Sequence, residues 1–150
     1  MLRSFLMGLV AGQRSMAPLA ALAVAARSGA LPHATAEARL MGHPFVAAGG
    51  VAMAAAEMAG DKMKTAPDRT VFLGLLARTI MGGFAGAALA PPQRRFAGAA
   101  LGGGAAIASS YCGLAARKRA MRQASQTSSG VVEDAIVLSA ALAIANAKSG

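Results

Sequence analysis

Apolar residues gather into five blocks that are separated by short polar segments. The blocks cover residues 4–26, 44–60, 71–90, 96–116 and 131–147. A helix needs about 20 residues, with a range of about 17–25, to span the hydrocarbon core of a bilayer. The segments between the blocks hold proline, serine and most of the charges, as connections do. The pattern predicts an all-α integral membrane protein: one domain, residues 1–150, with a bundle of about five transmembrane helices.

The composition favours lipid surroundings. Hydrophobic residues make up 55% of the chain and charged residues 14%, whereas soluble domains carry about 25% charged residues. The absence of Trp and the single Tyr leave only a weak aromatic belt, and an alanine-rich soluble bundle is the alternative. Cys112 is the sole cysteine, which excludes a disulfide within the chain.

Polar residues interrupt the first block. The interruption begins at Gly12, and Gln13 and Arg14 lie where a cleaved signal peptide would be apolar, so we expect the segment to stay in the mature protein. Pro18 removes one backbone hydrogen bond and clashes with the carbonyl four residues earlier. We therefore expect a first helix that is broken or re-entrant across residues 12–18, with Arg14 facing a polar pocket. The alternative is a simple proline kink with Arg14 snorkelling or paired structurally.

The third and fourth blocks predict a tightly packed hairpin. The hexapeptide FAGAAL occurs in both, and Pro91 and Pro92 lie between the copies. Small residues recur at a spacing of four, which places each set on one helical stripe and permits close backbone approach. The stripes are also candidate surfaces for a homo-oligomer. They consist of Gly82, Gly86 and Ala90, and of Gly98, Gly102 and Ala106.

Two groups of ionisable residues surround the second and third blocks. Glu57 and Asp61 share one helical face, where they could carry a proton or coordinate a cation. With Lys62 beside Asp61, a solvated helix end with local ion pairs is the alternative. Arg78, inside the third block, is either part of a site or half of a structural ion pair.

A further acidic pair opens the fifth block. Glu133 and Asp134 fall in its first turn, where Ser128 or Ser129 could cap the helix and the dipole favours carboxylates. Two adjacent acids exceed what capping requires, so we expect one to face the interior. The candidate polar pocket consists of Arg14, Ser15, Glu57, Asp61, Lys62, Arg78, Glu133 and Asp134.

Other kinds of site lack support in the sequence. His33 and His43 have no metal-ligand spacing, the glycine runs lack a phosphate-loop ending, and no nucleophile has partners. The net charge of +9 comes from basic residues without interleaved aromatics, which fits loops facing an anionic leaflet better than nucleic acid. We expect no enzyme activity, cofactor, metal or nucleic-acid partner.

The basic residues also predict an orientation. If each block crosses once, eight Lys and Arg lie on the side of the N-terminus and five on the other side. The more basic side faces the cytoplasm, which places the N-terminus inside and the C-terminus outside. The prediction assumes that the first block does not return to its own side.

Four motifs in order carry a family resemblance: GQRSMAPLAAL, EMAGDKMKTAPDRT, LLARTIMGGFAGAAL and VVEDAIVLSAALA. The chain resembles the domain-of-unknown-function 4126 family of bacterial integral membrane proteins from about Gly8 to about Ala147. Gln13 departs from the pattern, which commonly has Leu there. The resemblance implies a small multi-pass protein of the bacterial inner membrane and implies no activity.

The polar residues lead to two function hypotheses. The first is a transporter or channel for an ion or small polar solute, proton-coupled through the carboxylates and working among membrane lipids. The second is a non-transporting structural or assembly protein whose buried charges lock the helices together.

Overall fold

The first apolar block forms two helices, α1 (Leu2–Gln13) and α2 (Ala17–Arg27). The break lies within the segment 12–18 where the sequence places it. Arg14 has extended backbone dihedrals (φ −140°, ψ 112°) and ends α1. Pro18 lies in the first turn of α2, where its missing N–H costs nothing because first-turn amides have no intrahelical acceptor. The proline therefore begins a new helix instead of kinking an old one.

A computed structural model describes residues 1–31, 35–60, 72–120 and 126–147, with side chains from 116–120 and 126–130 left out of the description. This part of the chain is helical and contains no strand. After α2, its helices are α3 (Ala36–Gly42), α4 (Pro44–Gly60), α5 (Phe72–Leu89), the 3₁₀ turn η1 (Pro92–Arg94), α6 (Arg95–Ala120) and α7 (Gln126–Asn146).

The described chain thus has seven α-helices rather than five. The break in the first block adds one, and α3 adds another in a segment expected to be a loop. Two local motifs account for α3 and the turn before it. Gly29, with φ 72°, ends α2, since Ala30 N–H bonds to Ala25 C=O at 2.9 Å across it. Thr35 Oγ1 accepts the N–H of Ala38 at 3.2 Å and caps α3.

The expected start of the last helix is wrong. It begins at Gln126 rather than at residue 131, so Glu133 and Asp134 lie about two turns inside α7. Ser128 and Ser129 fall within the helix and are not its caps. Because the helix dipole acts mainly in the first turn, it does not explain how two acidic residues are stabilised at these positions. Another group must stabilise them.

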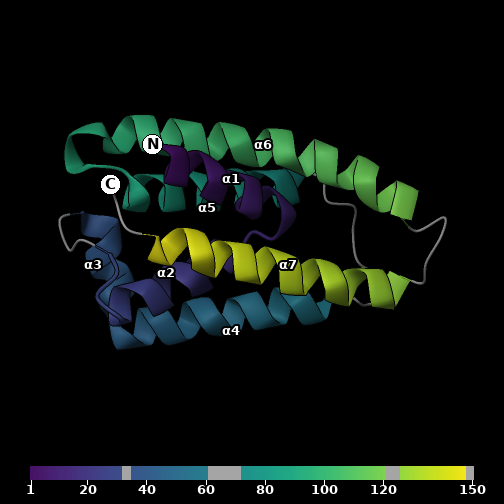
Figure 1. Ribbon diagram of the computed structural model, residues 1–150, viewed down its shortest axis with the longest axis horizontal. Coiled ribbons are helices and arrows are strands. Elements are labelled where there is room, and N and C mark those ends of the chain that lie inside the picture. Colours follow the sequence, from purple (N-terminus) through teal and green to yellow (C-terminus); the bar gives the residue numbers. More distant parts are fainter. Residues whose placement is uncertain (32–34, 61–71, 121–125, 148–150) are drawn as a thin grey trace.

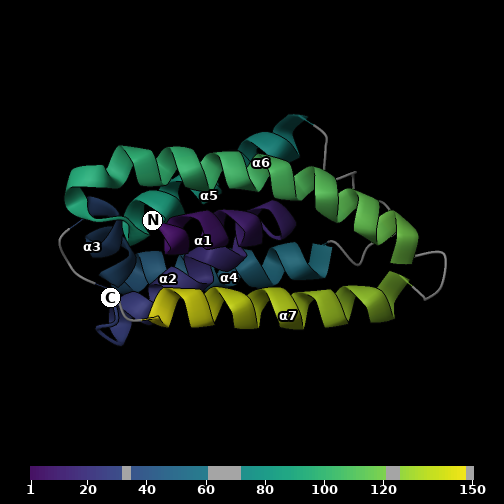
Figure 2. The same ribbon diagram turned by 45° about the horizontal axis from the view of Figure 1, so that its top comes forward.

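The helices form two groups. α1 packs against α5 and α6, whereas α2 packs against α4 and α7. Figure 1 shows the two groups as an upper and a lower half, and Figure 2 shows the same grouping from another side. The break between α1 and α2 is therefore the first point where the chain passes from one group to the other, and it passes again between α4 and α5 and between α6 and α7.

α1 and α2 form a hairpin that returns to the end where it started. Arg3, near the start of α1, donates to the Ala145 carbonyl of α7 at 2.7 Å. Ser28, just after α2, has its Oγ 3.5 Å from Oδ1 of Asn146, also on α7. Both outer ends of the hairpin thus lie at the C-terminal end of α7, and Figures 1 and 2 show N and C at this end.

The hairpin corrects the expected positions of the termini. Five helices that each run the length of the bundle would put the termini at opposite ends. Instead, α1 runs from the C-terminal end of α7 to the break, and α2 runs back to that end. With four long helices following (α4 to α7), the start of α1 and the end of α7 lie at one end of the bundle.

Glycine allows α5, α6 and α1 to approach closely, as the stripes predict for α5 and α6. A Cβ on Gly98 would come within 2.5 Å of both Ala90 Cβ and Gly86 O, and one on Gly82 within 2.7 Å of Gly102 O. Self-association through these stripes would thus require α5 and α6 to separate. α1 is a third partner that the stripes do not predict: a Cβ on Gly12 would lie 2.5 Å from Ala106 O of α6.

Small side chains line the interior, while many large apolar ones face outward. The buried apolar residues are mostly alanine. By contrast, Phe45, Phe72, Leu73, Phe96 and Ile136 are each more than 60% exposed, on α4, α5, α6 and α7. Within the described residues, α5 is the one helix long and apolar enough to cross a membrane, and α2 and α4 are apolar but shorter.

Candidate functional site at the helix break

The carboxylate of Glu57 on α4 caps the N-terminus of α2. Its Oε1 accepts the backbone N–H of Ser15 at 2.8 Å and the Ser15 hydroxyl at 2.6 Å. Its Oε2 accepts the N–H of Met16, also at 2.8 Å. Met16 provides no side-chain cap of its own, so these amides depend on a partner from elsewhere in the chain. A carboxylate here also meets the positive end of the α2 dipole.

Arg14, between the two helices, is held by Asp134 of α7. Its Nε lies 2.7 Å and its Nη2 2.5 Å from Oδ1 of Asp134. Arg14 is 1% exposed and Asp134 7% exposed. A buried charge is tolerated only with a close opposite charge and hydrogen bonds. This pairing gives Asp134 the partner that its place inside α7 requires.

Hydroxyls from α6 satisfy carbonyl groups at the end of α1. Ser109 Oγ donates to Leu9 O at 2.7 Å. The Ser110 hydroxyl has two acceptors within reach, Ala106 O of its own helix at 2.8 Å and Gly12 O of α1 at 3.2 Å. The side chain of Gln13 reaches the same place and donates through Nε2 to Ser109 O at 2.9 Å. Because α1 and α6 approach closely at Gly12, the short serine side chains of α6 reach the backbone of α1.

We call Arg14, Ser15, Met16, Glu57 and Asp134 the break cluster. Arg14, Ser15 and Met16 are neighbours in the sequence. They contact two carboxylates on separate helices, Glu57 on α4 and Asp134 on α7. Together with the serines of α6, three helices hold the point where the hairpin turns. Because each carboxylate holds a different part of this segment, the position of the hairpin depends on both.

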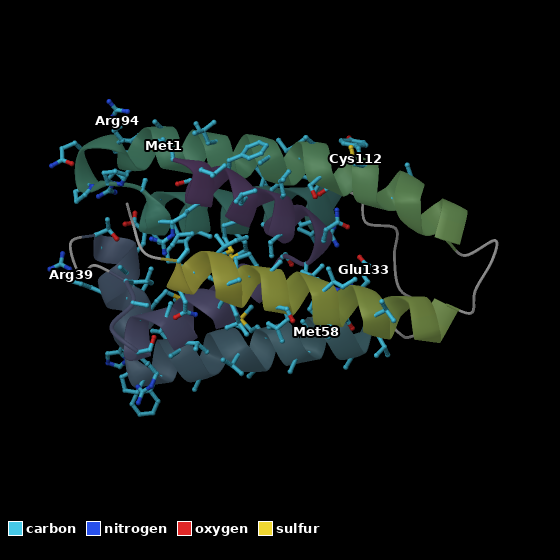
Figure 3. The ribbon with its side chains drawn as sticks, viewed as in Figure 1. Met1, Arg39, Met58, Arg94, Cys112 and Glu133 are labelled. Atoms are coloured by element: carbon cyan, nitrogen blue, oxygen red, sulfur yellow. The ribbon has the colours of Figure 1, made fainter. Side chains whose placement is uncertain are left out.

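The other predicted pocket residues are placed as follows. Arg78 is buried on α5, 6% exposed. Glu133 is half-buried on α7 and is labelled in Figure 3. Asp61 and Lys62 lie outside the described residues, so the expected face shared by Glu57 and Asp61 is not placed. Pro18 is buried behind the cluster in the first turn of α2.

The described part of the chain offers no candidate metal site. There, no group of three or more His, Cys, Asp and Glu side chains lies close enough to hold an ion. His43 is exposed at the end of α3, with its ring 5.8 Å from that of Phe45. His33 lies outside the described residues.

Several residues around the break are absent from the sequence-based site. Gln13, Ser109 and Ser110 bond across the α1–α6 contact. At the other end of α1, away from the break, Arg3 bonds to the last carbonyls of α7. The serine pair inside an apolar block is a readable sign, because hydroxyls there bond across helices. Nothing in the local sequence of Arg3 indicates a partner more than 140 residues away.

A family model described as Domain of unknown function (DUF4126) matches residues 1–148. Neither a curated protein nor a solved structure matches the chain. The geometry of the break cluster is therefore the basis for any statement about function.

Proposed function

Because the chain belongs to the family described as Domain of unknown function (DUF4126), which names no activity, we propose its function from geometry. The protein is a multi-pass membrane protein that moves an ion or a small polar solute, with the break cluster as its polar site. The observation that carries the proposal is the contact of Glu57 with the N-terminus of α2.

The outward apolar face supports placement in lipid. Soluble monomers rarely expose contiguous apolar patches larger than a few hundred Å². Here the exposed phenylalanines and aliphatic residues recur along α4, α5, α6 and α7. Alanine and glycine fill the interior, as in bundles that associate by close packing rather than by exclusion of water.

The lengths of the first two helices support a re-entrant hairpin. With 12 and 11 residues, α1 and α2 are about 18 Å and 16 Å long, too short for a core of about 30 Å. From Asp134, beside the break, to Ala145, beside Arg3, α7 rises about 16 Å. The break then lies about halfway through the bilayer, where broken helices are tolerated only against protein or a water-filled cavity.

A charged cluster at that depth is expensive, and such clusters commonly belong to ion or solute pathways. Protonation of Glu57 would remove the charge that the α2 dipole and two backbone N–H groups stabilise. The hairpin would then be held less firmly. The position of α2 thus depends on the charge of Glu57, and this dependence supports the proposal of proton-coupled transport.

The re-entrant hairpin changes the charge count behind the orientation. With four crossings, the end that bears the termini has six Lys and Arg, and the connections from α4 to α5 and from α6 to α7 have seven. The basic-residue bias now favours the side opposite the termini by one residue, so it no longer supports a cytoplasmic N-terminus. We keep the bacterial inner membrane as a proposal, with the N-terminus and the C-terminus on the same side of it.

Proton flux into liposomes tests the transport proposal. The full chain is reconstituted in liposomes that enclose a pH-sensitive dye, and an imposed pH gradient is followed with and without small cations and anions outside. We expect Glu57→Gln to reduce proton flux at least tenfold, because glutamine cannot carry the proton. Glu37→Gln is the matched control, since Glu37 lies on α3 and pairs with Arg95 at 3.6 Å, away from the break.

Two results would contradict the transport proposal. One is Glu57→Gln liposomes with the flux of wild type. The other is a wild-type protein that is inserted and folded but gives no flux above empty liposomes with any of the probes. Thermal unfolding of each variant in detergent shows whether a loss of flux reflects a loss of folded protein.

The second candidate is a non-transporting structural protein, and the buried Arg14–Asp134 pair favours it. Each contact of the cluster also closes the helix break, so locking the hairpin is a sufficient role for it. This candidate predicts no flux in wild type and a lower unfolding temperature for Glu57→Gln. The flux assay therefore separates the two functions.

A further inference from the structure

The outer side of α3 forms a shallow groove with α4, at the end of the bundle that bears both termini. It has a volume of about 600 Å³ and is lined by Ala36, Arg39, Leu40, His43 and Val46. Ala36 lies three residues from Arg39 and four from Leu40, so these three share one face of α3, and His43 is the C-cap that follows the helix. The opposite face, with Ala38 and Met41, is buried in the core. The groove is thus a surface that the fold of this chain leaves open.

The groove combines cationic and apolar chemistry. Arg39 and His43 are exposed beside Leu40, which is 50% exposed, and beside Phe45, which is 82% exposed. Figure 3 shows Arg39 pointing away from the bundle at the same end as Arg94. The acid nearest in sequence, Glu37, has its Oε1 3.6 Å from Nη2 of Arg95, so its charge is offset. A basic side chain over an apolar floor matches a molecule with an anionic head and an aliphatic tail.

We propose that this groove binds an anionic phospholipid, with the phosphate at Arg39 and an acyl chain along Leu40 and Val46. The inference rests on the membrane placement in the proposed function. If the bundle spans the bilayer, α3 lies beyond the end of the spanning helices, at the depth of the headgroups. An arginine there attracts anionic lipid, and exposed Leu and Phe side chains are stabilised in the interface.

Lipid retention tests the groove. The full chain is reconstituted in vesicles of equal parts phosphatidylglycerol and phosphatidylethanolamine, extracted in mild detergent, and its bound lipid is measured by native mass spectrometry. We expect wild type to retain phosphatidylglycerol selectively. Arg39→Gln should lower that retention about fivefold. Arg94→Gln, which removes an exposed arginine at the same end but outside the groove, should retain as much as wild type.

Three outcomes would overturn the lipid site. Arg39→Gln could retain as much phosphatidylglycerol as wild type, or Arg94→Gln could lose as much as Arg39→Gln, which would indicate a general attraction to a basic end. Displacement of the lipid by excess inorganic phosphate would indicate a site for a bare anion. A second variant, Leu40→Gln, keeps the charge and should also lower retention, because the acyl contact is lost.

The test separates this inference from the proposed function. Resistance of the wild type to extraction by alkaline carbonate is measured on the same membranes. A protein that washes out contradicts the membrane placement and with it both proposals. A protein that stays inserted but retains the two lipids equally contradicts the lipid site alone. For a protein that stays inserted, the flux measurement does not depend on which lipid is retained.

Discussion

Buried charges at the break are the feature that the sequence indicates best at the scale of single residues. Arg14, Ser15, Glu57 and Asp134 are candidates because charges inside apolar blocks need partners, and the structure brings these four together. Which carboxylate would meet which partner was not predictable. Glu57 and Asp134 are both within reach of a bent first block, and the choice depends on how α4 and α7 pack.

Replacing Asp134 by asparagine tests the buried pair. Asp134→Asn keeps the shape but leaves the Arg14 charge in a buried position without that carboxylate. Breaking a buried ion pair from one side costs about 3–5 kcal/mol, so we expect a loss of that size in the free energy of unfolding. Denaturant titration in detergent micelles, followed by circular dichroism, measures it.

The double variant Arg14→Met/Asp134→Leu is the control for the pair. It removes both charges and should recover most of the lost stability, because neither partner is left charged in the interior. Equal unfolding free energies for wild type and Asp134→Asn would show that the pair is not what holds Arg14 in place.

At the scale of elements, local sequence predicts the break in the first block but not its direction. Arg14 and Pro18 interrupt the helix in the expected place, and Pro18 starts α2. The return of α2 toward the start of α1 depends on Glu57, Asp134 and Ser110, which lie on helices distant in the chain. No window of local sequence contains that information. The cap at Thr35, by contrast, is a readable sign of α3 that the loop interpretation passed over.

Two glycines of α6 test whether close approach holds the hairpin of α5 and α6. A Cβ on Gly98 would collide with Gly86 and Ala90, whereas one on Gly104 would meet nothing within 4 Å. We expect Gly98→Ala to destabilise the protein by about 1–3 kcal/mol. Gly104→Ala should stabilise it by up to about 1 kcal/mol, because alanine favours the helix. The free energies of unfolding of the two variants, measured in one detergent, should therefore shift in opposite directions from that of wild type. If both shift with the same sign and size, close packing is not what holds α5 and α6 together.

At the scale of the whole molecule, the composition favours lipid surroundings, and the arrangement of side chains agrees with them. Alanine forms most of the buried apolar set, while many large apolar side chains are exposed. The hairpin was not predictable from composition. Residues 4–26 are long enough to form one spanning helix, whereas the structure divides most of them between α1 and α2.

The positions of the two termini test the re-entrant hairpin most directly. Reporters are fused in turn to the N-terminus and the C-terminus of the full chain in bacterial cells: green fluorescent protein, which fluoresces in the cytoplasm, and alkaline phosphatase, which is active outside it. The hairpin predicts that both ends give the same reporter response, because α4 to α7 make an even number of crossings. If one end responds as cytoplasmic and the other as external, the first block spans the membrane and the account of the break cluster is contradicted.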